Sequence, residues 1–327
     1  MEAKINWGIV GPGNIATKFV QNLKLLDEAK IVGVASRSLE KAERFSKEHN
    51  IEEAFGSYKA LFSFEAVDIV YIATPHRFHK ELSIEAMNAG KHVLCEKPLG
   101  VNRGEVEELV SAARKNNVFL MEGLWSRFNP SIKAAKKMID DGEIGDVNYL
   151  HADFSFYALD RDEQSRLLNP NLASGSLLDV GIYPIFLAYL LLGKPKDIHA
   201  VSIFHSNGTE LQTSMIFEYS KAQASLFSGF TCNSEIRAGI FGSEGELFIH
   251  PRWHQAHEFS RIKNGETEVF QYPLMGNGLF YEIEEVHRCL REKRLESSLW
   301  THQNSLDLAD LLDAVRGKSG IVFPFEL

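Results

Sequence analysis

The sequence predicts an α/β fold in which an N-terminal domain built on a parallel sheet precedes an α+β domain with an open, mainly antiparallel sheet. In the first 123 residues, short apolar runs alternate with helical segments. After residue 124, strand-like runs are instead separated by turn sequences such as Asn207-Gly208, which join antiparallel neighbours. The chain of 327 residues is also long for a single core. We therefore expect two domains, at 1–123 and 124–327.

Five apolar runs are the expected strands of the first domain. They begin near Trp7 and at Lys30, Asp68, His92 and Val118. The helical segments between them end at about Leu26 and otherwise cover 39–49, 78–89 and 105–115. Alternation of this kind produces right-handed crossovers and therefore a parallel sheet.

The second domain has helical segments and a longer series of strand-like runs. The helices are expected at 131–140, 177–192, 279–293 and 303–316, and the strands at 147–156, 200–204, 212–219, 222–230, 235–241 and 246–249. With helices on one face of the sheet, the other face needs a cover, because a large exposed apolar face is unusual for a monomer. We therefore expect a homodimer that forms through this sheet.

Composition excludes several classes of partner. A formal net charge of -9 argues against nucleic acid or an anionic membrane surface. The most membrane-like run, Val180–Leu192, is shorter than the ~20 residues that span a bilayer, and it reads as a buried helix. Three widely spaced cysteines and no signal-peptide pattern predict a cytoplasmic protein. His76 and His79 have no carboxylate or cysteine nearby to complete a metal site, so no metal is expected.

A glycine turn at the start of the chain predicts a dinucleotide site. Gly11, Gly13 and Ala16 form the pattern G-x-G-x-x-A directly after a strand and before a helix. Gly11 permits the tight turn, Gly13 permits close approach of a pyrophosphate, and the helix beginning at Asn14-Ile15 offers it unpaired N–H groups. This predicts a Rossmann domain.

The end of the second strand favours NADP over NAD. NAD sites usually offer an acidic residue there, whereas this chain has Ser36-Arg37-Ser38 with Lys41 one turn later. An arginine pairs with a 2′-phosphate through its planar fork. NAD remains the alternative cofactor.

Two further motifs carry candidate catalytic residues. Glu96-Lys97-Pro98 follows a strand at the edge where parallel sheets present their ligands. Asp179 and Tyr183 are four residues apart on an apolar helix and share one face. A carboxylate in such a helix is costly unless it is paired, which favours a functional role.

These motifs together resemble the Gfo/Idh/MocA family of NAD(P)-dependent oxidoreductases, named for glucose–fructose oxidoreductase, inositol dehydrogenase and rhizopine catabolism. The family pattern comprises the glycine turn, Thr74-Pro75, E-K-P and the D-x-G-x-Y of Asp179–Tyr183. The run Met121–Pro130 is similar to the branch with dimeric dihydrodiol dehydrogenase and NADP-dependent sugar dehydrogenases. The resemblance covers the whole chain. It places these residues on the cofactor side: Thr74, Pro75, His76, His79, Glu96, Lys97, Trp125 and Arg127.

The resemblance implies hydride transfer at a hydroxyl or carbonyl carbon, with Lys97 and Tyr183 contacting the reacting oxygen and Asp179 supporting them. A tyrosine hydroxyl loses its proton near pH ~10, so a neutral-pH role needs about 4 kcal/mol of differential stabilisation, and an ammonium group has the right sign for it. Which of Lys97 and Tyr183 finally donates the proton stays open.

Substrate recognition is expected from the second domain, through Phe154, Tyr157, Arg166 and Asn169, which suit a sugar-like or cyclic diol substrate. The family's aromatic-diol members carry arginines around Asn148 and Phe204, and their absence here argues against a dihydrodiol. His254 and His257 read as surface residues of a polar connection. Two alternatives remain: an NAD-linked polyol dehydrogenase, and a non-catalytic dinucleotide-sensing regulator.

Overall fold

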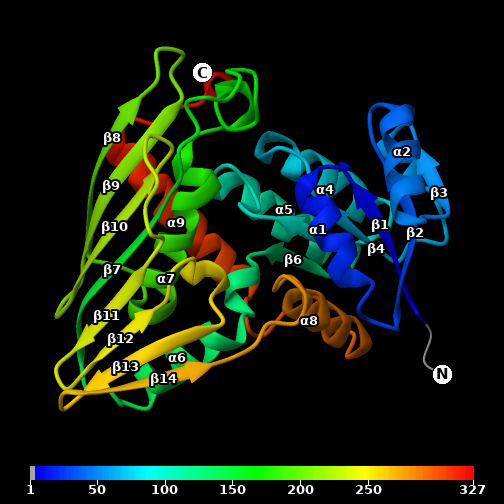
Figure 1. Ribbon diagram of the computed structural model, residues 1–327. Helices are drawn as coiled ribbons and strands as arrows, with labels where there is room; N and C mark the ends of the chain where they lie inside the picture. The colour runs from blue at the N-terminus through cyan, green and yellow to red at the C-terminus, as the bar shows by residue number, and fades with distance from the viewer. Residues whose placement is uncertain (1–3) are drawn as a thin grey trace. The chain divides into compact units, whose positions relative to one another are not determined.

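The computed structural model describes residues 4–327, and the chain forms two structural units (Figure 1). The first unit comprises the chain up to Phe128 together with Met275–Leu306. The second comprises Asn129–Leu274 and Asp307–Leu327.

The first unit is built on a six-stranded parallel sheet with the strand order β3-β2-β1-β4-β5-β6. Its strands are β1 Ile5–Val10, β2 Ala29–Ala35, β3 Glu53–Phe55, β4 Ile69–Ile72, β5 His92–Glu96 and β6 Leu120–Gly123. Its helices are α1 Asn14–Leu23, α2 Leu39–His49, α3 Tyr58–Phe62, α4 His79–Asn88, α5 Arg103–Asn116 and α8 Phe280–Arg291, and short 3₁₀ turns cover His76–Phe78 and Trp125–Arg127. The order reverses between β1 and β4, which is where doubly wound sheets bind their ligands.

The core of this unit explains why its strands read as continuous apolar runs. Strand β4 is buried along its whole length, as expected for a sheet covered on both faces. Tyr71 of β4 stacks on Phe19 of α1 with ring centroids 3.6 Å apart, and Trp7 of β1 meets Phe19 edge-on.

Residues 275–306 lie with the first unit, whereas the sequence boundary assigned them to the second domain. Side-chain and backbone contacts hold them there. The Trp7 indole N–H donates to His287 of α8 (3.0 Å), and the Leu120 N–H of β6 donates to the Leu295 carbonyl (3.1 Å). Strand β3 and helix α3 were also absent from the predicted elements, because they are only three and five residues long.

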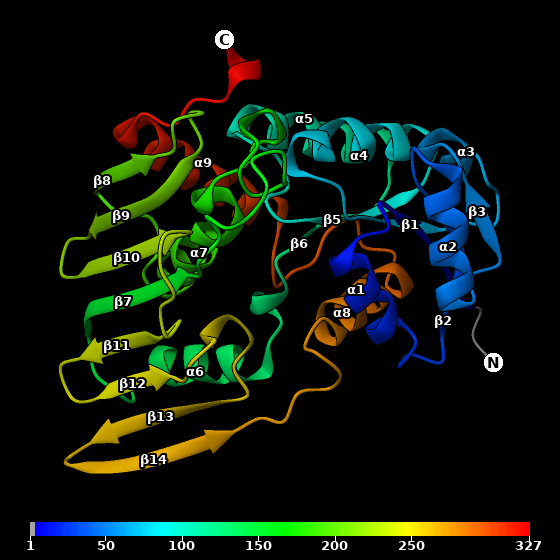
Figure 2. The ribbon, with the colours of Figure 1, turned by 45° about the horizontal axis from the view of Figure 1, so that its top comes forward.

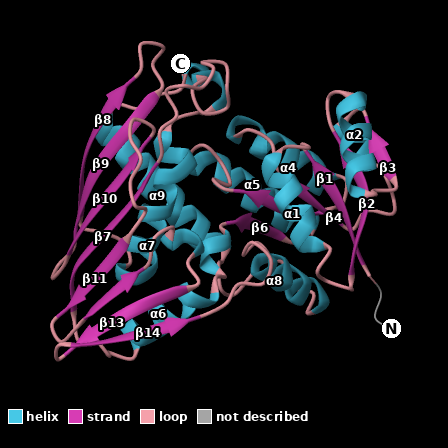
Figure 3. Ribbon diagram, in the orientation of Figure 1, coloured by secondary structure: helices cyan, strands magenta, loops and turns pink. Residues whose placement is uncertain are grey.

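The second unit is built on an eight-stranded, mainly antiparallel sheet with the order β14-β13-β12-β11-β7-β10-β9-β8 (Figure 3). Its strands are β7 Val147–Ser155, β8 Asp197–Phe204, β9 Glu210–Glu218, β10 Gln223–Gly229, β11 Ala238–Gly242, β12 Glu246–Ile249, β13 Glu258–Lys263 and β14 Glu266–Gln271. Only β7 and β10 pair in parallel among the described strands of this sheet. The predicted turn Asn207-Gly208 joins antiparallel neighbours, and so do the turn sequences Gly242–Gly245 and Asn264-Gly265. The predicted fold class is therefore confirmed.

Helices α6 Pro130–Asp140, α7 Ile182–Leu192 and α9 His302–Ser319 lie on one side of this sheet (Figure 2). The opposite face exposes large apolar side chains: Tyr149, Val201, Ile203 and Ile216 are each at least 40% exposed. Val201 pairs with Ser214, and Ile216 pairs with both His199 and Ser225, so this exposed face runs across neighbouring strands.

The helical stretch Pro170–Leu192 is long and apolar enough to cross a membrane. However, 78% of its most apolar window is buried inside the protein. This burial agrees with the prediction that Val180–Leu192 forms a buried helix.

Candidate active site

The glycine turn has the geometry that a pyrophosphate requires. Gly11 has φ +89°, and a Cβ there would lie 2.9 Å from the Ala73 carbonyl oxygen, so only glycine fits. A Cβ on Gly13 would meet no atom within 4 Å, so this side of the turn is open. Gly13 is the N-cap of α1, so the helix has no capping side chain, and its first turn has no acidic residue. Asn14 is exposed there and Ile15 half-buried. The unpaired N–H groups fit a dinucleotide phosphate.

Arg37 is held by two aromatic side chains at the end of β2. Its guanidinium lies 5.7 Å from the Phe78 ring centroid and is hydrogen-bonded to Tyr58. Burial raises the pKa of Tyr58 and the Arg37 charge opposes the rise. Ser38 accepts a hydrogen bond from the Lys41 N–H as the cap of α2, and Lys41 is exposed. A fixed arginine in this place, with no carboxylate before Glu40, fits a 2′-phosphate.

His79 braces the loops that follow β4 and β5. It is fully buried, with Nδ1 2.7 Å from the Pro98 carbonyl oxygen and Nε2 2.8 Å from that of Thr74. Burial lowers the pKa of His79. A neutral imidazole donates to only one of these carbonyls. His79 therefore supports the Thr74-Pro75 segment from within, and His76 is buried beside it at 5.8 Å between ring centroids.

Glu96 lies in a buried carboxyl cluster at the end of β5. The Tyr71 hydroxyl donates to Glu96, and burial, followed by the charges of Glu96 and Glu282, raises the pKa of Tyr71 well above its ordinary value. Both carboxyl oxygens of Glu282 are buried, with no hydrogen-bond partner in the described part of the chain. Burial and the Glu96 charge raise the pKa of Glu282 well above its usual range. Tyr71 thus acts as a hydrogen-bond donor that fixes the Glu96 side chain.

Glu122 of β6 is a second buried carboxylate whose charge interacts with Lys97. Its carboxylate accepts hydrogen bonds from the Leu99 N–H (2.9 Å), the Ser305 hydroxyl (2.6 Å) and the Trp300 indole (3.2 Å). Burial raises the pKa of Glu122, while these donors and the Lys97 charge oppose the rise. Lys97 itself is half-buried. Two buried carboxylates, Glu96 and Glu122, therefore accompany the lysine at the sheet edge.

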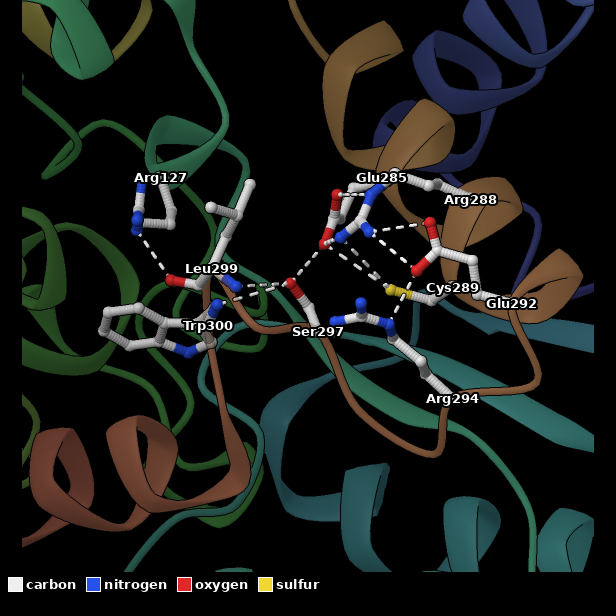
Figure 4. Close-up of polar contacts among 9 residues, drawn as sticks. All are labelled: Arg127, Glu285, Arg288, Cys289, Glu292, Arg294, Ser297, Leu299 and Trp300. Atoms are coloured by element: carbon white, nitrogen blue, oxygen red, sulfur yellow. Dashed lines mark hydrogen bonds and ion pairs between the residues drawn. The ribbon is translucent and has the colours of Figure 1, made fainter.

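Arg127 is anchored within the first unit (Figure 4). Its Nε donates to the Leu299 carbonyl at 2.8 Å. Leu299 is held in turn, because its N–H donates to the Ser297 hydroxyl (3.0 Å) and that hydroxyl donates to Glu285 of α8. Arg127 and Trp125 are both half-buried. Part of the donor capacity of Arg127 is thus used to fix its own segment.

In the second unit, Asp179 has the partner that its burial demands. Arg166 donates to the Asp179 carboxylate at 2.9 Å, and the Asp179 side chain is only 10% exposed. Asp179 lies on a π-helical turn, Leu177–Gly181, that precedes α7, where the sequence predicted a continuous α-helix. A Cβ on Gly181 would lie 2.8 Å from the Ser228 hydroxyl of β10. The glycine of the D-x-G-x-Y motif therefore lets this turn pack against the sheet.

A buried carboxylate on β9 holds the start of the same helical segment. Glu210 is 1% exposed and accepts hydrogen bonds from the Leu177 N–H (2.8 Å) and from the hydroxyls of Ser176 (2.7 Å) and Thr213 (2.7 Å). Gly175, at φ +121°, leaves room for it, since a Cβ there would lie 3.0 Å from Glu210 Oε2.

Tyr183 lies in a cluster of three rings. Its ring centroid is 5.5 Å from that of Phe154 and 5.3 Å from that of His254, and these two stack at 4.4 Å. His254 is 7% exposed, so its interpretation as a surface residue was wrong. Burial comes from packing against β7 and α7, while the local sequence around His254 is polar.

Two other predicted substrate residues are placed differently. Tyr157 is 48% exposed. Asn169 accepts from the Asn171 N–H (3.0 Å) and donates to Gln164 (3.1 Å), so its amide stabilises a local turn. Within the second unit, the structure therefore brings Phe154 to Tyr183 and Arg166 to Asp179.

Sequence reasoning missed three residues of these surroundings: Glu122, Glu210 and His254. Glu122 could have been found, because it ends an apolar strand as Glu96 does. Glu210 and His254 lack such a signal, since each stands beside a polar turn. No group of three or more His, Cys, Asp or Glu side chains within residues 4–327 is placed to hold a metal ion.

Comparisons with known proteins cover both units. The family model described as "Oxidoreductase family, NAD-binding Rossmann fold" (Gfo/Idh/MocA) matches residues 5–124, and the model of the Gfo/Idh/MocA C-terminal domain matches residues 132–248. The chain is 37% identical to trans-1,2-dihydrobenzene-1,2-diol dehydrogenase of Mus musculus over 336 residues, and 34% identical to scyllo-inositol 2-dehydrogenase (NADP(+)) IolU of Bacillus subtilis over 325 residues. Each alignment covers 98% of both chains. Among solved structures, KijD10, a 3-ketoreductase from Actinomadura kijaniata in complex with NADP and TDP-benzene, superposes with a TM-score of 0.88 at 26% identity, over 97% of this chain and 98% of that one.

Proposed function

This chain belongs to the Gfo/Idh/MocA family of NAD(P)-dependent oxidoreductases that act on CH–OH groups, and from that premise we propose that it is an NADP-linked enzyme for a sugar-like or cyclic diol substrate. The observation that carries the proposal is the setting of Lys97. It follows β5 at the ligand-binding edge of the sheet, beside the buried carboxylates of Glu96 and Glu122. A cation fixed there is suited to a reacting oxygen.

The preference for NADP rests on Arg37. A guanidinium positioned by Phe78 and Tyr58 matches a 2′-phosphate better than a ribose hydroxyl. The relative IolU is named for NADP(+), and KijD10 was solved with NADP, which supports the same preference here.

When bound, the dinucleotide supplies or accepts the hydride at its nicotinamide. We assign the turn of Gly11, Gly13, Asn14 and Ile15 to the pyrophosphate, and the remaining predicted residues of the first unit to the rest of the cofactor. Lys97 and Tyr183 handle the proton of the reacting oxygen. Asp179, neutralised by Arg166, orients the helical turn that leads to Tyr183.

The substrate class follows from the second unit. Aromatic rings at Phe154 and Tyr183 offer a face for a sugar ring, and His254 adds polar atoms to them. The relatives named above act on an inositol and a cyclic diol, which supports a carbocyclic or sugar-like substrate for this chain.

We also propose a cytoplasmic homodimer. The apolar face of the sheet that carries Val201, Ile203 and Ile216 is the candidate interface, with a second copy of the chain as its partner. All three cysteines are free, which supports a reducing compartment.

The test is a turnover panel with the purified protein. NADPH and NADH are each offered with sugars, anhydro-sugars and dicarbonyls, and NADP⁺ is offered with polyols and aromatic diols, while nicotinamide absorbance is followed. We expect turnover of at least one sugar-like or cyclic diol compound, and faster turnover with NADPH than with NADH. Equal efficiency with both cofactors would overturn the NADP assignment. Tight cofactor binding without any turnover would instead indicate a dinucleotide-sensing regulator.

A further inference from the structure

His254 is a polar group held within the ring cluster of the proposed catalytic Tyr183. Its imidazole stacks on Phe154 with an interplanar angle of 24° and lies at 49° to the Tyr183 ring. With 7% of its surface exposed, it is almost as buried as Tyr183, which is 6% exposed. The three side chains come from η5 (Trp253–Gln255), β7 and α7.

The turn that carries His254 is fixed on both sides. The preceding Trp253 is fully buried, and its indole N–H donates to the Asp153 carbonyl at 3.0 Å. Two residues after His254, the Ala256 carbonyl accepts from the buried Asn129 amide at 3.0 Å. These contacts hold the turn, and packing on Phe154 and Tyr183 holds the imidazole, so its place in the cluster is a built feature of the second unit.

His254 differs chemically from the other two rings of the cluster, Phe154 and Tyr183. Phe154 offers only an apolar face, and the Tyr183 hydroxyl is assigned to the reacting oxygen. An imidazole carries a donor and an acceptor on its edge, a combination that matches a hydroxyl group. Because Phe154 covers one face of the ring and Nδ1 is buried, Nε2 is the edge nitrogen through which His254 can act.

We propose that His254 is a specificity-determining residue that recognises a second substrate hydroxyl, the one on the carbon next to the reacting carbon. This inference rests on the proposed function and refines it, since it selects vicinal polyols and sugars over substrates with a single hydroxyl. A site built to bond a hydroxyl discriminates strongly against the analogue that lacks it.

The test compares matched substrate pairs in the wild type, His254→Phe and His254→Asn. The pairs are D-glucose with 2-deoxy-D-glucose and trans-1,2-cyclohexanediol with cyclohexanol, each with NADP⁺. Phenylalanine keeps the stacking on Phe154 and removes the polar edge, while asparagine keeps a donor and an acceptor. His257→Phe is the control, because His257 is an exposed histidine three residues further on.

We expect His254→Phe to lower kcat/KM for the vicinal compound at least about tenfold, the value of one hydrogen bond, and to leave the deoxy partner within about threefold. His254→Asn should restore part of the preference. An unchanged preference in His254→Phe, or an equal loss on both members of a pair, would overturn the inference. A wild-type enzyme that turns over none of these compounds would contradict the proposed substrate class itself, so the two failures are distinguishable.

Discussion

Replacing Glu210 tests whether a buried carboxylate holds the helical segment of Asp179 and Tyr183. In Glu210→Ala, the hydroxyls of Ser176 and Thr213 keep other partners, at 3.0 Å on Ser228 and 2.7 Å on Ser202. The Leu177 N–H opens the helical segment and has no acceptor within it, so it is left unpaired in a buried place. An unpaired buried N–H costs about 1–3 kcal/mol, and the small cavity adds roughly 1 kcal/mol.

We therefore expect Glu210→Ala to lower the free energy of unfolding by roughly 3 kcal/mol, measured by urea denaturation with circular dichroism. Glu210→Gln keeps an acceptor for Leu177 and the side-chain volume, so it should cost about 1 kcal/mol or less. The exposed Glu218→Ala, on the same strand, is the control and should stay within about 0.5 kcal/mol. A Glu210→Ala variant as stable as the wild type, or a Gln variant as unstable as the Ala variant, would refute this reasoning.

Three further predictions concern pH, cofactor and assembly. Burial lowers the pKa of His287 to about 4, so the unfolded chain binds a proton at this histidine more readily than the folded chain does. The free energy of unfolding should therefore fall by on the order of 3 kcal/mol as pH drops from about 6.5 to 4. His287→Gln should flatten this loss in acid-denaturation curves, and an unchanged curve would contradict the role of His287. Arg37→Asp should reverse the preference for NADP by about tenfold or more in kcat/KM, and an unaltered ratio would remove Arg37 from the 2′-phosphate site. Val201→Glu should convert a dimer into a monomer in light scattering. Val322 is also an exposed valine, at 54%, but it lies outside the strands of the sheet, so Val322→Glu should leave the dimer intact.

Local patterns in the sequence predicted the longer strands and helices of residues 1–123 and marked Glu96–Pro98 and Asp179–Tyr183 as candidate catalytic motifs. The glycine pattern assigned Gly11 to a tight turn. The structure shows why only glycine fits there, because φ is positive and the surrounding backbone is crowded. The position of Glu96 and Lys97 at the ligand-binding edge could be predicted because the carboxyl ends of parallel strands lie at one edge of the sheet. The paired state of Asp179 followed from the cost of burying a charge, although its partner Arg166 had been expected to contact substrate.

The rest depends on tertiary packing that short windows do not encode. His254 sits in a polar stretch, and it is buried because its ring packs on Phe154 and Tyr183 while its turn is tied to Asp153 and Asn129, all distant in sequence. Residues 275–306 follow the second sheet in sequence but bond to Trp7 and Leu120. Their placement is therefore decided by contacts between segments far apart in the chain.

The most direct test of the account is the effect of Lys97→Met on chemistry and on cofactor binding, measured separately. Turnover is followed with the best compound of the panel, and the dissociation constant of NADP is measured by titration. We predict a loss of kcat of about 10²–10⁴-fold, the usual contribution of a group that handles a proton, with NADP affinity unchanged within a few fold. Retained turnover, or a loss of NADP affinity as large as the loss of rate, would contradict the role of Lys97 at the reacting oxygen.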